Sequence, residues 1–567
     1  MEPACKLRRG NPGRKGSIGR KRNLVFKGNR YTPAPQNKKN IDAKARSSFE
    51  AAQLVKSASK SKLSSNQFHC EVSPAQYRLV DLSLLLPFLQ KNLFCQCGTK
   101  FVFDETSIRG FGFELKFECT NKKCQFSSSV LSSKLVGPKK NIYEVNRRSV
   151  LASRTAGLGL TGLQTICGMM DLPQPVTQLT YQIINENLEI AAKKVATKSM
   201  QQAVAEESQR TPKNDPGLSV SGDGTWRTPG FTSLQGAASL IGHHTGKVID
   251  IITKNKFCQA CRRWENKNKD SAEYLEWFEV HKEKCKVNHT GSSGLMEVDG
   301  IVEMFKRATT VNKVMYKNYI GDGDCKVYAK IKQVKPFGES FIVEKKEDIN
   351  HVGKRMGTRL RNKKKDCGKN VLSDVKTIGG RGRLTAVAID QLSSYYTLAI
   401  RRNTTVTGMY NDIWATFFHK RSTDANPQHH LCPPGAQSWC KWLKALAQST
   451  LNKFIHKSSI PPAIMDYIKN IYEDLSKTEL LEKCVGAYSQ NANEFLNHLL
   501  WKYVPKKQWS GGTILNIGAF IAVSTFNDGK IYQAEVQKTM SSKETRSANL
   551  KRKHNYPDDD SYVPGGH

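Results

Sequence analysis

LSVSGDGTW (residues 218–226) is the stretch that decides the fold. Apolar and polar residues alternate from Leu218 to Ser221, which is typical of a half-buried strand, and the sequence Gly-Asp-Gly with Asp223 at its centre follows directly. A second stretch, VMYKNYIGDGD (314–324), has the same form and carries Asp322. The two stretches predict two strands that each lead into a carboxylate.

The elements between these two stretches predict how they are arranged. Residues 233–243 and 247–254 are rich in apolar and β-branched residues and are expected to form two more strands joined by a short turn. Residues 295–305 place apolar side chains at helical spacing. The order strand-strand-strand-helix-strand is that of a ribonuclease-H-like α/β domain, in which the first and fourth strands are neighbours. We therefore expect Asp223 and Asp322 to face each other.

Two facing carboxylates suit a site for divalent ions. Two such ions about 3.5–4 Å apart can activate the attacking oxygen and stabilise the leaving oxygen in phosphodiester cleavage. Oxygen ligands favour Mg²⁺ or Mn²⁺. The alternative is that the Gly-Asp-Gly sequences simply form turns.

The third carboxylate of such a site is expected on a late helix. The stretch SQNANEFLNHLL (489–500) is helical in pattern, and Glu494 lies near its start. Glu494 follows Asp322 by 172 positions, which is too long a gap without an inserted domain. Residues 372–480, mostly helical in pattern, fit such an insertion.

The chain carries a large positive charge. Its 567 residues include 88 Lys and Arg against 50 Asp and Glu, a formal net charge of +38. This surplus implies a polyanionic partner, because binding to phosphates releases counterions. Nucleic acid is the first candidate; an anionic membrane surface and a merely solvated basic surface are the alternatives, and the amphipathic pattern of membrane binding is missing. We find no secretory leader and no apolar run long enough for a bilayer, so an intracellular protein is expected.

Composition divides the chain into zones. Basic tails at both ends are expected to be disordered, and the cluster Arg20-Lys21-Arg22 favours a nuclear location. The expected zones are a basic tail (1–65), a zinc-ribbon-like module (66–140), a helical region (141–212), the first part of the core (213–371) with a zinc-knuckle-like insert (256–290), the mainly helical insertion (372–480), the completion of the core (481–535) and a second tail (536–567).

Cysteines and histidines form two groups with the close spacing of zinc ligands. In a reducing compartment, close cysteine pairs favour metal over disulfide. The first group flanks a β-rich segment and resembles a zinc ribbon, with buried free cysteines as the alternative. The second is a set of three cysteines and one histidine, with His289 as a spare. The expected ligands are Cys95, Cys97, Cys119 and Cys124 in the first group, and Cys258, Cys261, His281 and Cys285 in the second.

A third group is less complete. It joins His351 to His429 and Cys432, with Cys440 as a further candidate. The alternative is that these histidines line a nucleic-acid groove or pack in the core. The basic run 345–369 is expected to contact DNA phosphates, or else to form a solvated helix face. The candidate phosphate contacts are Lys354, Arg355, Arg359 and Arg361.

An ordered set of motifs runs through residues 80–530. In chain order these are SGDGTW (221–226), CQAC (258–261), NHTGSSGLMEVDG (288–300), YIGDGDCKVY (319–328), NHVGKRMGTRLR (350–361), HHLCPPGAQSWCKW (429–442) and QNANEFLN (490–497). Together they resemble the Mutator-like transposases of animal mobile elements. The resemblance implies an Asp-Asp-Glu trio on a ribonuclease-H-like core, and its motifs support Asp223, Asp322 and Glu494, with Asp324 close behind Asp322.

The resemblance also implies an activity and partners. These are metal-dependent cleavage of DNA at terminal inverted repeats and attack of the freed 3′ hydroxyl on target DNA, by a homo-oligomer. One position departs from the family pattern: Asp348 stands where the family pairs a cysteine with the histidine of the NHVGKR stretch. A carboxylate is a poorer partner for zinc than a thiolate, so the departure weakens the expected third zinc site.

Two other hypotheses remain beside an active transposase. A host-adopted, non-catalytic DNA-binding protein would fit the Asp348 departure, although all three acids are intact. An RNA-processing nuclease on the same core ranks last, because the chain has no RNA-recognition motif with paired aromatics.

Overall fold

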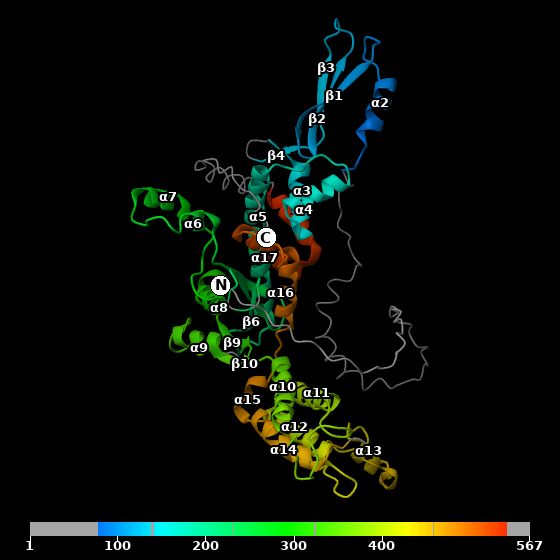
Figure 1. Cartoon of the computed structure of the whole chain (residues 1–567), viewed down its shortest axis with the longest axis vertical. Helices are drawn as coiled ribbons and strands as arrows, with labels where there is room; N and C mark the ends of the chain where they lie inside the picture. The colour runs from blue at the N-terminus through cyan, green and yellow to red at the C-terminus, as the bar shows by residue number, and fades with distance from the viewer. Residues whose placement is uncertain are drawn as a thin grey trace, which may run out of the picture. The chain divides into compact units, whose positions relative to one another are not determined.

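The computed structural model describes residues 77–137, 141–228, 230, 232–322, 325–456 and 459–540. Most of its helices and strands are labelled in Figure 1. The fold is mixed α/β, and about half of it is helical. The first expected tail up to residue 65, residues 541–567 of the second, the cluster Arg20-Lys21-Arg22 and Asp324 lie outside the described residues. The prediction of a disordered tail from residue 536 is wrong for 536–540, which are the end of a helix that buries Val536 and Met540. No helix of the described ranges has the length and apolarity that a membrane crossing requires.

A small β-sheet module comes first. Its elements are α2 (Leu82–Asn92), β1 (Phe101–Arg109), β2 (Gly112–Cys119) and β3 (Ser127–Leu131). The three strands form an antiparallel sheet in the order β1-β2-β3. Phe101, Phe103 and Phe117 pack edge-to-face or tilted against one another on this sheet, and these contacts form much of its small apolar core.

A helical segment links this module to the large sheet. Its elements are β4 (Leu135–Val136), β5 (Ile142–Tyr143), α3 (Glu144–Thr155), α4 (Leu160–Met169) and α5 (Gln178–Arg210). Much of the expected helical region (141–212) is the single 33-residue helix α5, which begins after the Thr177 cap.

The central sheet has five strands. They are β6 (Leu218–Trp226), β7 (Gln235–Gly242), β8 (Val248–Asn255), β9 (Tyr316–Gly321) and β10 (Glu344–Glu347), and the order across the sheet is β10-β9-β6-β7-β8. The first three strands form an antiparallel meander, whereas β9 and β10 run parallel to β6. The first and fourth strands are therefore neighbours. The strand β10 lies where the sequence suggested the start of a basic helix.

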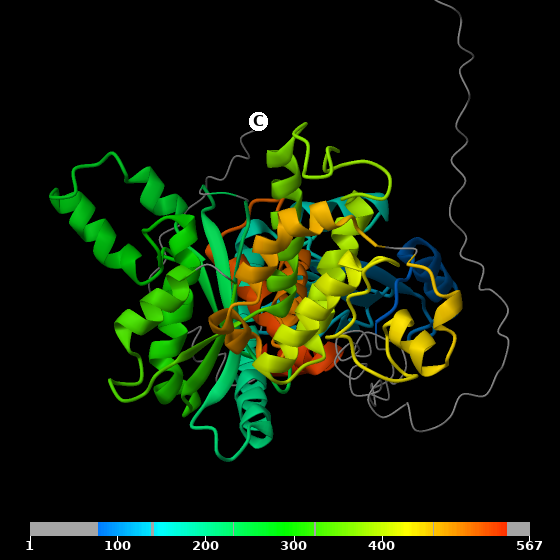
Figure 2. The ribbon, with the colours of Figure 1, turned by 90° about the horizontal axis from the view of Figure 1, so that it is seen from below.

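Helices cover both faces of the sheet, as Figure 2 shows. On one face lies α8 (Ser293–Arg307), with α9 (Cys325–Val334) beside it. On the other face lie α5, α16 (Asn491–Tyr503) and α17 (Gly512–Asp528), with α18 (Tyr532–Met540) against α5. Between β8 and α8 the chain forms a short insert with α6 (Gln259–Arg263) and α7 (Ala272–Lys282).

Six helices separate β10 from α16. They are α10 (Ile349–Cys367), α11 (Ala386–Arg401), α12 (Val406–Arg421), α13 (Lys441–Ala447), α14 (Pro462–Leu475) and α15 (Thr478–Cys484). Short turns of other helix types are η2 (Ala308–Asn312), η3 (Leu451–Lys453) and η4 (Gly529–Ile531). The six-helix region has its own apolar core, which extends from Ile349 to Cys484 and includes the fully buried Tyr396 and Tyr472. Because α15 also contacts β10, this region joins the sheet at its β10 edge.

Candidate active site

The register of the parallel strands places the two expected aspartates side by side. Ser221 on β6 pairs with Ile320 on β9. Asp223, still within β6, lies two residues beyond this pair, and Asp322 directly follows the last residue of β9. Neighbouring strands are about 4.8 Å apart, so a register continued by two residues would bring Asp223 and Asp322 level with each other on the same side of the sheet.

The third parallel strand adds another acid at this level. Glu347 on β10 pairs with Gly321 on β9, so the next residue, Asp348, lies level with Asp322. Asp348 is only 2% exposed and caps α10 by accepting a hydrogen bond from the backbone N–H of Asn350 at 3.0 Å. Burial raises the pKa of this carboxyl.

The helix α16 is fastened to β6 by a ladder of side chains. Successive rungs three or four residues apart lie on one face of the helix. Gln490 Nε2 donates to the Gly222 carbonyl (2.7 Å), Ser221 Oγ donates to Asn493 Oδ1 (2.7 Å), Asn497 Nδ2 donates to Asp223 Oδ2 (2.7 Å), and Trp501 Nε1 donates to Thr225 Oγ1 (2.7 Å). The ladder fixes the rotation and the level of α16 against the strand.

This ladder brings Glu494 to the site. Glu494 lies in the first turn of α16, between the rungs at Asn493 and Asn497, and its charge is felt by Asp223. The pKa of Asp223 is raised to about 6, chiefly by burial and in addition by the charge of Glu494, while the hydrogen bonds from the Gly224 N–H and Asn497 oppose that rise. Acids gathered in this way repel one another, and a divalent cation would relieve the repulsion.

His351 also belongs to this site. Its Nδ1 lies 2.9 Å from Asp322 Oδ1 and 3.7 Å from Asp348 Oδ2. The expected role of His351 as a ligand of the third Cys/His group is therefore wrong. The physical reason is that α10 starts directly after β10, so the first turn of α10 stays at the sheet edge beside the acids.

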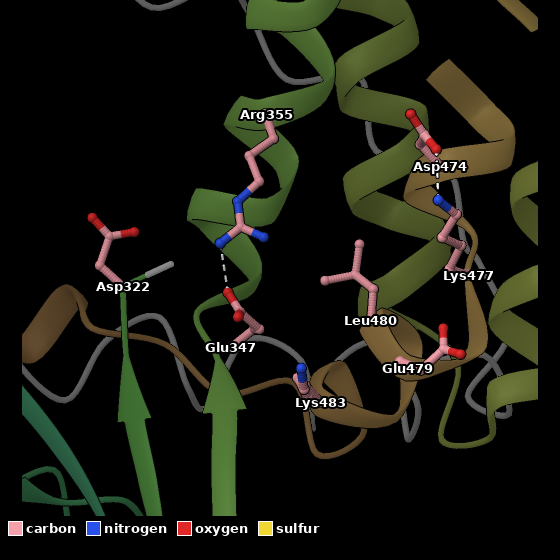
Figure 3. A pocket seen from close by; sticks show the side chains of 8 residues that line it. All are labelled: Asp322, Glu347, Arg355, Asp474, Lys477, Glu479, Leu480 and Lys483. Atoms are coloured by element: carbon pink, nitrogen blue, oxygen red, sulfur yellow. Dashed lines mark hydrogen bonds and ion pairs between the residues drawn. The ribbon is translucent and has the colours of Figure 1, made fainter. Parts of the chain in front are cut away.

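A cavity opens beside Asp322, between the strand ends and the six-helix region (Figure 3). Its volume is about 480 Å³. Asp322 projects from the tip of β9 on one side, and Arg355 reaches from α10 to Glu347 at 2.6 Å. The remaining lining residues are Asp474, Lys477, Glu479, Leu480 and Lys483.

The four expected phosphate contacts all lie on α10. Arg355 lines the cavity, Arg359 pairs with Asp474 at 3.3 Å, and Arg361 pairs with Asp390. Lys354 is exposed, and its charge is felt by the Asp348 carboxyl. The helix thus presents cations next to the acids, but three of these cations already have an intrachain carboxylate partner.

Two Cys/His groups assemble as the sequence predicted. In the β1–β3 module, Cys95, Cys97, Cys119 and Cys124 place their sulfurs within 4.8 Å of one another. In the α6–α7 insert, Cys258, Cys261, His281 and Cys285 do the same with their ligand atoms. His289 is not among them, because its ring lies against the Ser292 carbonyl (2.9 Å) and Asp299 (3.3 Å). Both groups could bind zinc.

The third group has a different membership from the one expected. It consists of His419, His429, Cys432 and Cys440, whose ligand atoms lie within 4.8 Å of one another. His419 stands in place of His351, and Cys440, the further candidate, is the fourth member. Because Asp348 lies at the carboxylate site, the departure at that position leaves the third group intact, and the expected weakening of a zinc site by Asp348 is wrong. The spacing His-x9-His-x2-Cys-x7-Cys was visible in the sequence, but lacks the close second pair of a familiar zinc motif.

Comparison with known families agrees with the motifs as far as residue 440, whereas the stretch QNANEFLN (490–497), which carries Glu494, lies beyond the matched residues. The family model for the Mutator-like transposase matches residues 76–440, which is more than half of the chain. The chain therefore belongs to the Mutator-like transposase family. No match was found among the curated proteins or among the solved structures.

Proposed function

We propose that this protein is a metal-dependent DNA transposase, with a ribonuclease-H-like core in which Asp223, Asp322 and Glu494 hold Mg²⁺ or Mn²⁺. The proposal is supported by the β6–β9 register, which leads toward Asp223 and Asp322, and by the α16 ladder, which holds the helix of Glu494 against β6. The strand order β10-β9-β6-β7-β8 supports the choice of core.

The chemistry follows from the arrangement of oxygen ligands. Bound divalent ions would activate the attacking oxygen and stabilise the leaving one. In the first step water attacks the phosphorus at the element end, and the bond to the 3′ oxygen breaks to leave a free 3′ hydroxyl. In the second step this hydroxyl attacks a phosphodiester of target DNA, and one bond forms as another breaks. Asn497 donates to Oδ2 of Asp223 and so restricts the orientation of this carboxylate.

The charge of the chain supports DNA as the substrate. A net charge of +38 favours a phosphate backbone, and the cavity beside Asp322 has Arg355, Lys477 and Lys483 in its wall. We propose that terminal inverted repeats and target DNA bind here, to a homo-oligomer working in the nucleus.

The non-catalytic alternative loses its main reason. It rested on the Asp348 departure, the Cys/His groups and the charge, and the first of these no longer supports it, because Asp348 lies beside His351 and outside the third Cys/His group. The Cys/His groups and the charge fit either hypothesis.

The test is a nicking assay on labelled duplex DNA carrying the element's terminal repeat. We expect Mg²⁺-dependent nicks from the wild type and none from Asp223→Asn, with full activity in Asp390→Asn, which changes an exposed aspartate of α11. Equal nicking by wild type and Asp223→Asn would refute the assignment of the acid. A matched RNA duplex added as competitor tests the nuclease alternative, since preferential cleavage of RNA would favour it.

A further inference from the structure

The group of His419, His429, Cys432 and Cys440 lies in the six-helix region, away from the acids. His419 is in the last turn of α12, and Cys440 is the residue that precedes α13. Cys440 is fully buried, and His429 and Cys432 are each 5% exposed. Four soft or borderline ligands therefore meet at a point that water hardly reaches.

The distances fit a tetrahedral ion. Cys440 Sγ lies 3.4 Å from His429 Nδ1, and Cys432 Sγ lies 3.8 Å from His419 Nδ1 and 3.9 Å from His429 Nδ1. Zinc binds sulfur at about 2.3 Å and imidazole nitrogen at about 2.0–2.1 Å, which gives a sulfur–nitrogen edge of roughly 3.6 Å in a tetrahedron. The observed edges are centred on that value.

The charge of the set suits its burial. Two thiolates and two neutral imidazoles cancel the two positive charges of Zn²⁺, so the filled site is neutral, and neutral groups are the ones that interiors accept. Binding would release the two thiol protons. The four-cysteine group near β1 would instead carry two negative charges when filled, and its Cys97 is exposed.

His429 contacts His456, which in turn contacts Asp424, and these contacts determine which nitrogen of His429 can bind metal. Asp424 Oδ1 lies 2.6 Å from His456 Nδ1, and a carboxylate only accepts, so Nδ1 of His456 carries the proton. In the neutral ring, Nε2 of His456 is then an acceptor, and it lies 2.9 Å from His429 Nε2, which donates to it. This leaves His429 Nδ1 with a free lone pair on the side where the two sulfurs lie.

From these contacts we propose that the group is a structural zinc site and that His456 and Asp424 are positioning residues for its ligand His429. Hydrogen-bond partners that are not themselves ligands, such as these two residues, hold a ligand histidine in one tautomer and one orientation. The local apolar core is small, with Ala415 as the fully buried apolar partner of the two cysteines among the described residues. The metal would therefore hold α12, α13 and the turn at His456 together, where side-chain packing alone is sparse.

The experiment measures zinc bound per chain in the full-length protein, together with the absorption of its Co²⁺-substituted form. We expect Cys440→Ser to lose one zinc equivalent relative to the wild type. The control His430→Gln changes the histidine next to His429 and should lose none. His351→Gln should also lose none, because His351 lies at the acid site.

The role of His456 and Asp424 as positioning residues is tested separately, beginning with the exposed Asp424. Asp424 is 58% exposed, so Asp424→Asn should fold normally. We expect Asp424→Asn and His456→Gln to keep the full zinc content but to give up one equivalent to a competing chelator at 10–100-fold lower chelator concentration. The zinc site would be overturned if Cys440→Ser kept its full zinc content, or if His351→Gln lost one equivalent. The role of His456 and Asp424 would be overturned if Asp424→Asn and His456→Gln both resisted the chelator as well as the wild type does. None of these readings depends on DNA cleavage.

Discussion

The proposed carboxylate site and the Cys/His group of the α6–α7 insert draw their candidate ligands from different distances along the chain. The insert takes its four ligands from residues 258–285. The carboxylate site takes Asp223, Asp322 and Glu494 from positions that are 99 and 172 residues apart. One site is built by a local segment, and the other exists only when the strand register and the α16 ladder are in place.

This difference predicts how each site fails. In the insert, Trp277 stacks between Trp264 (4.6 Å) and the ligand His281 (4.7 Å), so the ligand and its support lie within one short segment. At the carboxylate site, Asn497 and Asn493 reach the strand from a helix more than 260 residues further along the chain. Damage to the insert should stay local, whereas the carboxylate site depends on the whole sheet layer.

The largest expected effect is in the insert. Cys285→Ser removes one ligand of a group whose metal-binding free energy, for structural zinc, is typically about 10–16 kcal/mol. We expect hydrogen exchange of residues 258–285 to accelerate by at least about a hundredfold, since the segment has little other core. The sheet strands should keep their protection. Lys282→Ala, an exposed change in the same helix, is the control; loss of protection in β6 would show that the insert is not a local unit.

The next effect is catalytic. Asp322→Asn should lower nicking by about three orders of magnitude, because an acid that binds the ion is worth several kcal/mol in the transition state. Its side chain is 62% exposed, so the free energy of unfolding should change by less than about 0.5 kcal/mol. Asp466→Asn, another exposed and ion-paired aspartate, is the matched control. A variant that nicks normally would shift the second acid to another residue.

The local and long-range sites also differ in what could be predicted from sequence. The eight ligands of the first two Cys/His groups followed from spacing alone. The strands that carry Asp223 and Asp322 followed from alternation and from Gly-Asp-Gly. Glu494 rested on the resemblance, because no periodic pattern tells how a helix folds back after a six-helix region.

Two features of the fold could not be predicted from the sequence, for physical reasons. The strand β10 has the sequence EKKE, which lacks any apolar alternation; its buried Lys345 and Glu347 satisfy each other at 3.5 Å, and Glu347 also meets Arg355. His419 lies inside a helical pattern, ten positions before His429, and only the fold of the chain after α12 brings the two together. Because the strand β10 was not predicted, the position of His351 beside Asp322 and Asp348 was not predicted either.

The pH dependence of the free energy of unfolding should distinguish the buried Asp223 from the exposed Asp322. Burial raises the pKa of Asp223 from 3.8 to about 6. Between pH 4 and pH 6 the folded protein binds this proton more tightly than the unfolded chain, so the wild type loses stability as pH rises through that window. In chelator, Asp223→Asn should therefore be more stable than the wild type by about 2–3 kcal/mol at pH 7.5 and equally stable at pH 4.

Urea unfolding at the two pH values measures this difference. Mg²⁺ should stabilise the wild type and not the variant, because ligands that bind only the folded state shift its stability. Asp322→Asn, which changes an exposed carboxylate, should show no gain at either pH. If Asp223→Asn were still more stable than the wild type at pH 4, burial of the charged carboxylate would not be the cause of its added stability.

The smallest effect is at Asp348, the position that most directly distinguishes the two kinds of site. Asp348→Ala removes the cap of α10 and should cost about 1 kcal/mol, whereas Asp348→Asn keeps a capping oxygen and should cost less. Asp348→Cys restores the family residue beside His351. If position 348 belongs to the carboxylate site, this cysteine adds no zinc, because the third group is already complete with His419 and Cys440. A gain of one zinc equivalent in Asp348→Cys would instead mean that His351 takes part in a metal set of the Cys/His kind, and the division between the two sites would no longer hold.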